Sequence, residues 1–175
     1  MVNSAASGLP STINSIKRAI MIIGRKQMQS WVQTLLYAAK QREGGSSDAL
    51  MLTATVRGKL LESIAMADRP HDKNHQDRAF MVGVLSLLDT LLGIAMSELV
   101  GTLSIQKDMS EALLTRRGPL GYQLALIEAY EKGETEIVSS MLTELGFLSM
   151  EEFTRLELEA AAWANRITDA VNQTA

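Results

Sequence analysis

The chain has 175 residues, 46% of them hydrophobic and 5% aromatic, with three prolines and a formal net charge of −3 at pH 7. That length suits one domain with a single core, and the apolar residues, mainly Leu, Ile, Ala and Met, favour helices over strands because straight-chain residues lose little rotamer freedom in a helix. The absence of cysteine excludes disulfides, Cys-ligated metal sites and thiol nucleophiles.

Residues 10–41 are predicted to form two helices. Isoleucines recur at spacings of three and four residues from Ile13 to Ile23, which places them on one helical face. Gly24 can end or kink this helix, and the same period then continues to about residue 41. A stretch rich in Gly and Ser at residues 43–47 predicts a loop.

The charge of the chain is unevenly spread. Residues 1–43 carry six basic side chains against one acidic, a net charge of +5, and the remainder carries 11 against 19, a net charge of −8. Such asymmetry can mark an acidic partner or a nucleic acid. Because the basic residues are interleaved with apolar ones at helical spacing, the solvated face of an amphipathic helix is the simpler interpretation.

A third helix is predicted from Asp48, which is a plausible N-cap. An apolar residue recurs every four positions from Leu52 to Ile64, so we expect this face of the helix in the core. The polar residues 69–75, which include Pro70, then predict a loop.

The fourth predicted helix, residues 76–92, is apolar nearly all the way round, which is typical of a helix at the centre of a bundle. Gly83 within it would let a neighbouring helix approach closely. The longest apolar stretch, residues 82–96, contains Asp89 and falls short of the roughly 20 residues that span a bilayer. Residues 1–12 show no secretory signal, so we expect a cytoplasmic protein with no membrane contact.

Shorter helices are predicted in the rest of the chain. Residues 116–119 break the helical pattern, and further helices are expected at 120–133 and 137–146, each stopped by a glycine. Ser149 and Glu152 have the spacing of a capping box ahead of a last helix with an apolar stripe. No segment alternates apolar and polar residues with period two, so the sequence predicts an all-α fold, a single bundle of roughly eight to nine helices.

The most tempting site is the polar segment at residues 71–77, which holds both histidines of the chain. Histidines four residues apart on a helix can share a metal ion, and a site here would use His71, Asp72, His75 and Asp77. The dipeptide His71-Asp72 also matches the one that names the HD phosphohydrolases. The alternative is a solvated connector, which we favour because a catalytic metal needs a buried supporting shell and an exposed loop supplies none.

No other constellation predicts catalysis or a cofactor. Both histidines lie in one polar segment, so no Ser–His pair can be argued, and no Gly-rich phosphate loop with its Lys-Ser/Thr is present. Trp31 and Trp163 lie on apolar helical stripes, which favours core positions over stacking on nucleic-acid bases. Arg116 and Arg117, which we predict to be exposed beside a Gly-Pro turn, are the residues we expect at a protein interface, with an ordinary solvated turn as the alternative.

Five stretches carry a resemblance to a known family through their order and spacing. They are VNSA at residues 2–5, RKQMQSW at 25–31, AFMVGVLSLLD at 79–89, ALLTRRGPLG at 112–121 and EAYE at 128–131. Together they resemble the HDOD domain, an HD-related output domain, in the C-terminal region of bacterial EAL–HDOD signalling proteins. The resemblance covers nearly the whole chain.

The resemblance implies a relation to HD-type phosphohydrolases, whose metal site uses a His-Asp dyad in a buried helix. In many HDOD relatives this helix resembles Ala-Phe-x-x-Gly-Leu-Leu-His-Asp. Aligned on Ala79, Phe80 and Gly83, the present sequence has Ser86 and Leu87 at the dyad. These two residues are not a competent ligand set for a divalent metal, so the resemblance implies a degenerate HD site without phosphohydrolase activity.

We therefore expect residues 1–175 to be one HDOD-like domain that lacks the N-terminal helices usual in the family. Its expected function is that of a non-catalytic signal-transduction module that contacts a protein partner or an adjoining EAL-type domain, with self-association as a further option. The resemblance implies a link to cyclic-di-GMP signalling. A metal-dependent phosphohydrolase and a sensor of a nucleotide or another small ligand are the alternatives.

Overall fold

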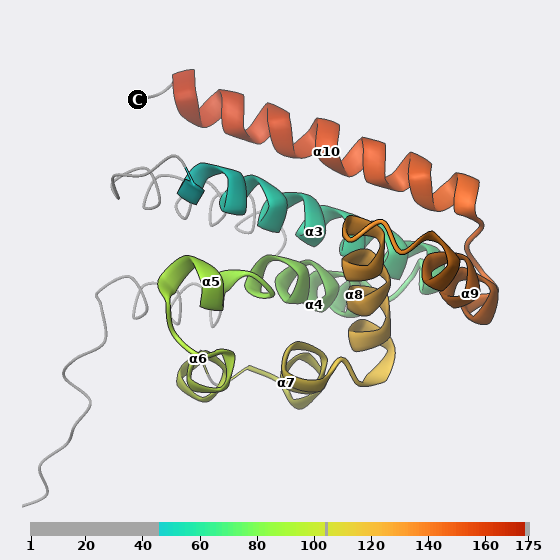
Figure 1. Cartoon of the computed structure of the whole chain (residues 1–175), viewed down its shortest axis with the longest axis horizontal. Helices are drawn as coiled ribbons and strands as arrows, with labels where there is room; N and C mark the ends of the chain where they lie inside the picture. The colour runs from blue at the N-terminus through green and yellow to red at the C-terminus, as the bar shows by residue number, and fades with distance from the viewer. Residues whose placement is uncertain (1–45, 104, 174–175) are drawn as a thin grey trace, which may run out of the picture.

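The computed structural model describes residues 46–103 and 105–173 and is helical, with no strand among these residues (Figure 1). The helices are α3 (Ser46–Asp68), α4 (Lys73–Leu85), α5 (Leu88–Leu92), α6 (Met96–Leu103), α7 (Lys107–Thr115), α8 (Gly118–Glu131), α9 (Thr135–Leu145) and α10 (Met150–Gln173). This confirms the predicted all-α fold. The two helices predicted within residues 10–41, and Trp31, lie outside the described residues, so the expected total of eight to nine helices stays a prediction.

Helix α4 occupies the centre of the described bundle, as its apolar sequence predicts. Figure 1 shows it between α3 on one side and α7 on the other, while α10 runs along the far side of α3. Every residue from Ala79 to Leu85 in α4 is buried. The rings of Phe80 and of Trp163 from α10 form an edge-to-face pair with centroids 6.1 Å apart, so the helix at the centre also contacts the outer layer.

Two glycines let α3 and α4 pack closely. A Cβ atom added to Gly83 would lie 2.6 Å from the carbonyl carbon and oxygen of Arg57 and from the Cα of Gly58, and one added to Gly58 would lie 2.6 Å from a methyl of Val84. No side chain fits at such distances, so the close approach predicted for Gly83 is confirmed. The consequence is that Arg57 lies directly against α4.

The predicted single helix at residues 76–92 is wrong at its start and in its continuity, whereas its predicted end at Leu92 is where α5 ends. Helix α4 begins at Lys73, because the Asp72 carboxylate caps it by accepting a hydrogen bond from the His75 amide at 2.9 Å. It ends at Leu85, where the Ser86 hydroxyl donates to the Gly83 carbonyl at 2.7 Å. A turn at residues 86–87 then separates it from the short α5.

The C-terminal helices end and begin close to where the sequence predicts. Helix α9 stops at Gly146, whose φ of 71° is a left-handed conformation that favours glycine. The capping box before α10 is confirmed. The Glu152 carboxylate accepts from the Ser149 amide at 2.9 Å, and the Ser149 hydroxyl lies 3.2 Å from the Glu152 amide. Phe153, the first buried anchor of α10, follows directly and is 0% exposed.

None of the helices in the described part of the chain combines the length and the apolar character that crossing a membrane requires.

Candidate functional site

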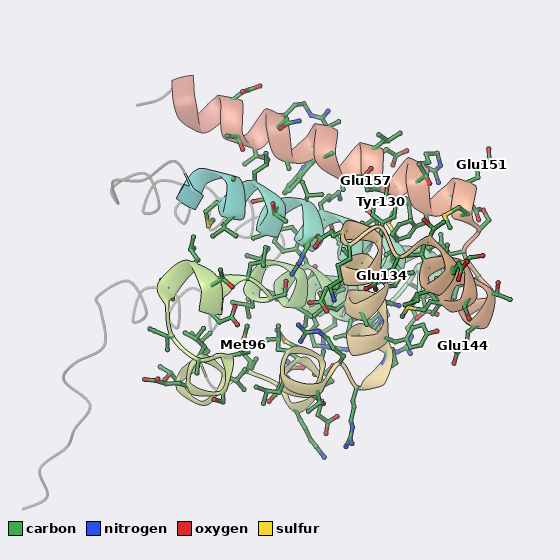
Figure 2. All side chains as sticks on the ribbon, viewed as in Figure 1. Met96, Tyr130, Glu134, Glu144, Glu151 and Glu157 are labelled. Carbon is green, nitrogen blue, oxygen red and sulfur yellow. The ribbon has the colours of Figure 1, made fainter. Side chains whose placement is uncertain are left out.

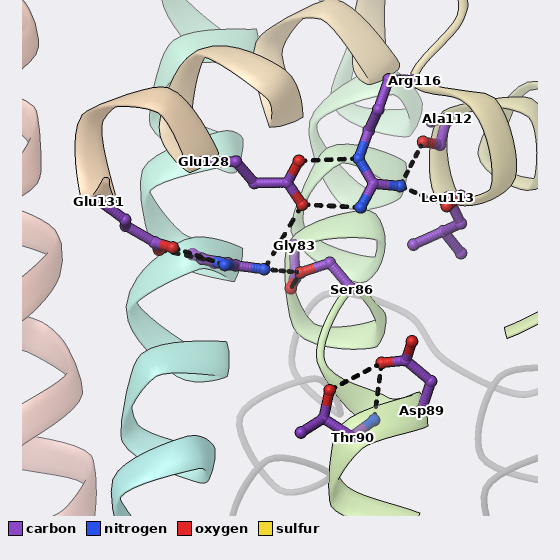
Figure 3. Close-up of polar contacts among 10 residues, drawn as sticks. Gly83, Ser86, Asp89, Thr90, Ala112, Leu113, Arg116, Glu128 and Glu131 are labelled. Carbon is purple, nitrogen blue, oxygen red and sulfur yellow. Dashed lines mark hydrogen bonds and ion pairs between the residues drawn. The ribbon is translucent and has the colours of Figure 1, made fainter. Parts of the chain in front are cut away.

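A network of two arginines and two glutamates lies where α3, α4 and α8 meet (Figure 3). Its centre is Arg57 on α3, whose side chain is only 10% exposed. A buried guanidinium must be paired, since an isolated charge in a protein interior loses its hydration without compensation. The groups that pair with Arg57 therefore compensate a buried charge in this part of the core.

Arg57 binds the carboxylate of Glu131 through two parallel hydrogen bonds. Its Nε lies 2.8 Å from Oε1 and its Nη2 lies 2.5 Å from Oε2 of this residue, which ends α8. Such a two-pronged pair fixes orientation as well as charge. The remaining Nη1 donates to the Ser86 hydroxyl at 2.9 Å and lies 3.8 Å from Oε1 of Glu128. One side chain of α3 is thus bonded to the end of α4 and to the last turn of α8.

Glu128 carries the network onward to Arg116. The guanidinium of Arg116 grips this carboxylate with Nε at 2.9 Å and Nη2 at 2.7 Å. Its Nη1 also donates to the carbonyls of Ala112 (3.2 Å) and Leu113 at the end of α7. The Ala112 carbonyl accepts from the Arg116 amide as well. Arg116 itself is the left-handed residue that ends α7, with φ 55°. Two cations and two anions from three elements, α3, the end of α7 and α8, thus compensate one another.

Ser86 occupies the position that the family alignment assigns to the histidine of the dyad. Its hydroxyl donates to the Gly83 carbonyl and accepts from Arg57 Nη1. A serine nucleophile needs a neighbouring base to take its proton, whereas the hydrogen-bond neighbours here are a carbonyl and a guanidinium. Leu87, at the position of the aspartate, instead lines an apolar pit with side chains of α3, α4 and α5. This arrangement holds helices together and offers no activated nucleophile.

The structure scatters the four residues of the alternative metal site. His71 is exposed, Asp72 caps α4, and Asp77 is half-buried on α4. His75 is 2% exposed on the first turn of α4, so the predicted exposed loop is wrong at this residue, because the cap at Asp72 starts the helix early. Within residues 46–103 and 105–173, no group of three or more His, Asp or Glu side chains could hold a metal ion.

His75 is nevertheless in an unusual environment. Burial, together with the nearby cations of Arg69 and Arg78, lowers its pKa from the ordinary 6.5, and this outweighs the carboxylates of Asp68 and Asp72, which act in the opposite direction. Its Nε2 lies 4.0 Å from the nearer carboxylate oxygen of Asp68, beyond hydrogen-bond distance. His75 is therefore held neutral at neutral pH.

The two arginines expected at an interface differ in their environment. Arg117 is exposed. Arg116 is half-buried, with a side chain 34% exposed, and its guanidinium donates hydrogen bonds to Glu128 and to carbonyls at the end of α7. The prediction of an exposed Arg116 is therefore wrong, since capping α7 turns its side chain inward. A contact of either residue with a partner stays a prediction.

Sequence reasoning missed Arg57, Glu128 and Glu131. A signal was present, because Arg57 interrupts an apolar stretch of α3 and the two glutamates stand three residues apart on a mostly apolar helix. Charges in such positions are seldom left without a partner. Their mutual pairing, across 74 residues of sequence, could not be read from spacing.

Comparisons with known proteins agree with the resemblance. The HDOD domain matches residues 1–99. The chain is 30% identical over 166 residues to the cyclic di-GMP phosphodiesterase CdgJ of Vibrio cholerae, which covers 95% of this chain and 37% of that protein. It is 29% identical over 171 residues to the uncharacterized protein YuxH of Bacillus subtilis, covering 97% of this chain and 40% of that protein.

The chain thus spans about two fifths of the length of these curated relatives. No solved structure matches it significantly. The domain match extends over more than half of the chain, and the all-helical architecture agrees with it. The chain belongs to the HDOD family.

Proposed function

We propose that the chain is a non-catalytic signal-transduction module, a degenerate HD domain that acts through protein–protein or interdomain contacts. The observation that carries this proposal is the chemistry at the dyad position. Ser86 there is hydrogen-bonded to the Arg57 guanidinium, so a fixed protein cation occupies the surroundings of the position at which a phosphohydrolase would need a divalent metal. A cation within the chain holds helices together but cannot activate a water molecule.

The cellular part of the proposal rests on similarity to CdgJ. That protein is named a cyclic di-GMP phosphodiesterase, and the present chain matches 37% of its length. We propose that the chain serves cyclic-di-GMP signalling in the cytoplasm by contacting a protein partner or an adjoining EAL-type domain, and that it binds neither nucleic acid nor membrane. This contact, and not turnover of a phosphate ester, is its output.

Metal and ligand binding test this proposal directly. Metal-stripped protein is melted with and without Mn²⁺, Mg²⁺ or cyclic di-GMP, and hydrolysis of bis-p-nitrophenyl phosphate and cyclic di-GMP is followed in parallel. A ligand present at 100 times its dissociation constant stabilises the folded state by about 2.7 kcal/mol, which raises the melting temperature of a chain of this size by roughly 5 °C or more. We expect no such rise and no turnover.

The alternatives predict different results in the same experiment. A phosphohydrolase would bind metal stoichiometrically, turn over the ester and lose that activity on His71→Ala. A small-ligand sensor would be stabilised by cyclic di-GMP without turnover. Either result would overturn the proposal of a module that acts through contacts alone.

A further inference from the structure

We draw no further inference here: the strongest candidate, the outward face of α10 (Figure 2), where Leu158 is 64% exposed, carries none because nothing in the part of the chain that the structure describes shows what covers it.

Discussion

At the scale of the residue, His75 couples folding to pH. Its folded-state pKa is lowered by burial and by Arg69 and Arg78, whereas in the unfolded chain it titrates near 6.5. The unfolded state therefore binds more protons as the pH falls below this value, and the free energy of unfolding decreases with it. The stabilisation is fully present above about pH 6.5 and is lost as the pH drops toward the lowered value.

Replacing His75 by Gln should remove this pH dependence. We expect the free energy of unfolding of the wild type to fall between pH 7.5 and 5.5 with a slope that reaches at most about 1.4 kcal/mol per pH unit. The slope should be clearly smaller for His75→Gln, and urea denaturation followed by circular dichroism measures it.

His71→Gln is the control for that experiment, because His71 is exposed four residues away. Its slope should match that of the wild type. If the nearby Asp68 governed His75 instead of burial, the wild type would gain stability as the pH falls, and the physical reading of this site would be wrong.

At the scale of the element, the crossing of α3 and α4 depends on the missing side chain of Gly83. Alanine is the better helix former by about 1 kcal/mol, but its Cβ would lie 2.6 Å from backbone atoms of Arg57 and Gly58. Backbone cannot swing aside as a flexible side chain can. We therefore expect Gly83→Ala to lower the free energy of unfolding by about 2 kcal/mol or more, as measured by urea denaturation.

Gly101→Ala provides the comparison, since Gly101 lies within α6 and no atom of the described residues lies within 4 Å of a Cβ added to it. There only the helix propensity changes, so stability should rise by roughly 0.5–1 kcal/mol. A loss of similar size at both glycines would mean that close helix packing is not what Gly83 provides.

The elements show where sequence patterns were sufficient. The boundary at Gly146 and the capping box of Ser149 and Glu152 depend on residues within a few positions of one another, and both were predicted. The break after Leu85 was missed, because it lies in a run of apolar residues that continues the helical pattern. At this break the Ser86 hydroxyl donates to the Gly83 carbonyl of its own helix and accepts from Arg57 of α3, a contact that the local sequence does not reveal.

At the scale of the whole molecule, the candidate site follows from contacts between distant parts of the chain. The resemblance to the family predicted that Ser86 occupies the position of the dyad histidine. That prediction needs only the alignment of residues 79–87 with the family pattern. It could not predict that Arg57 and Glu131 would meet there, because 74 residues separate them. The burial of His75 was missed for the same reason, since its neighbours in sequence are polar and only the fold covers it.

The network joins α3, α4, α8 and the end of α7, so it should contribute to stability as one unit. Arg57→Met would leave Glu131 and Glu128 without their shared cation. We expect the free energy of unfolding to fall by about 3 kcal/mol. This is the lower end of the range for a broken buried pair, because the Glu131 side chain is 30% exposed. Glu131→Gln should cost less, about 1–2 kcal/mol, since Arg57 retains Ser86. The double variant should fall short of the sum by about 1 kcal/mol or more.

The surface pair of Arg155 and Glu159 on α10 separates this effect from ordinary ion pairing. Its side chains are 60% and 58% exposed and four residues apart, so the same double-mutant cycle with Arg155→Met and Glu159→Gln should give a coupling of only about 0.3–0.5 kcal/mol. The Arg57 guanidinium is buried and bonded to fixed partners from two other helices, so salt screens it little. The coupling energy between Arg57 and Glu131 should therefore change little between 50 mM and 500 mM salt. Equal couplings in the two cycles, or equal sensitivity to salt, would show that the network does not hold the four elements together.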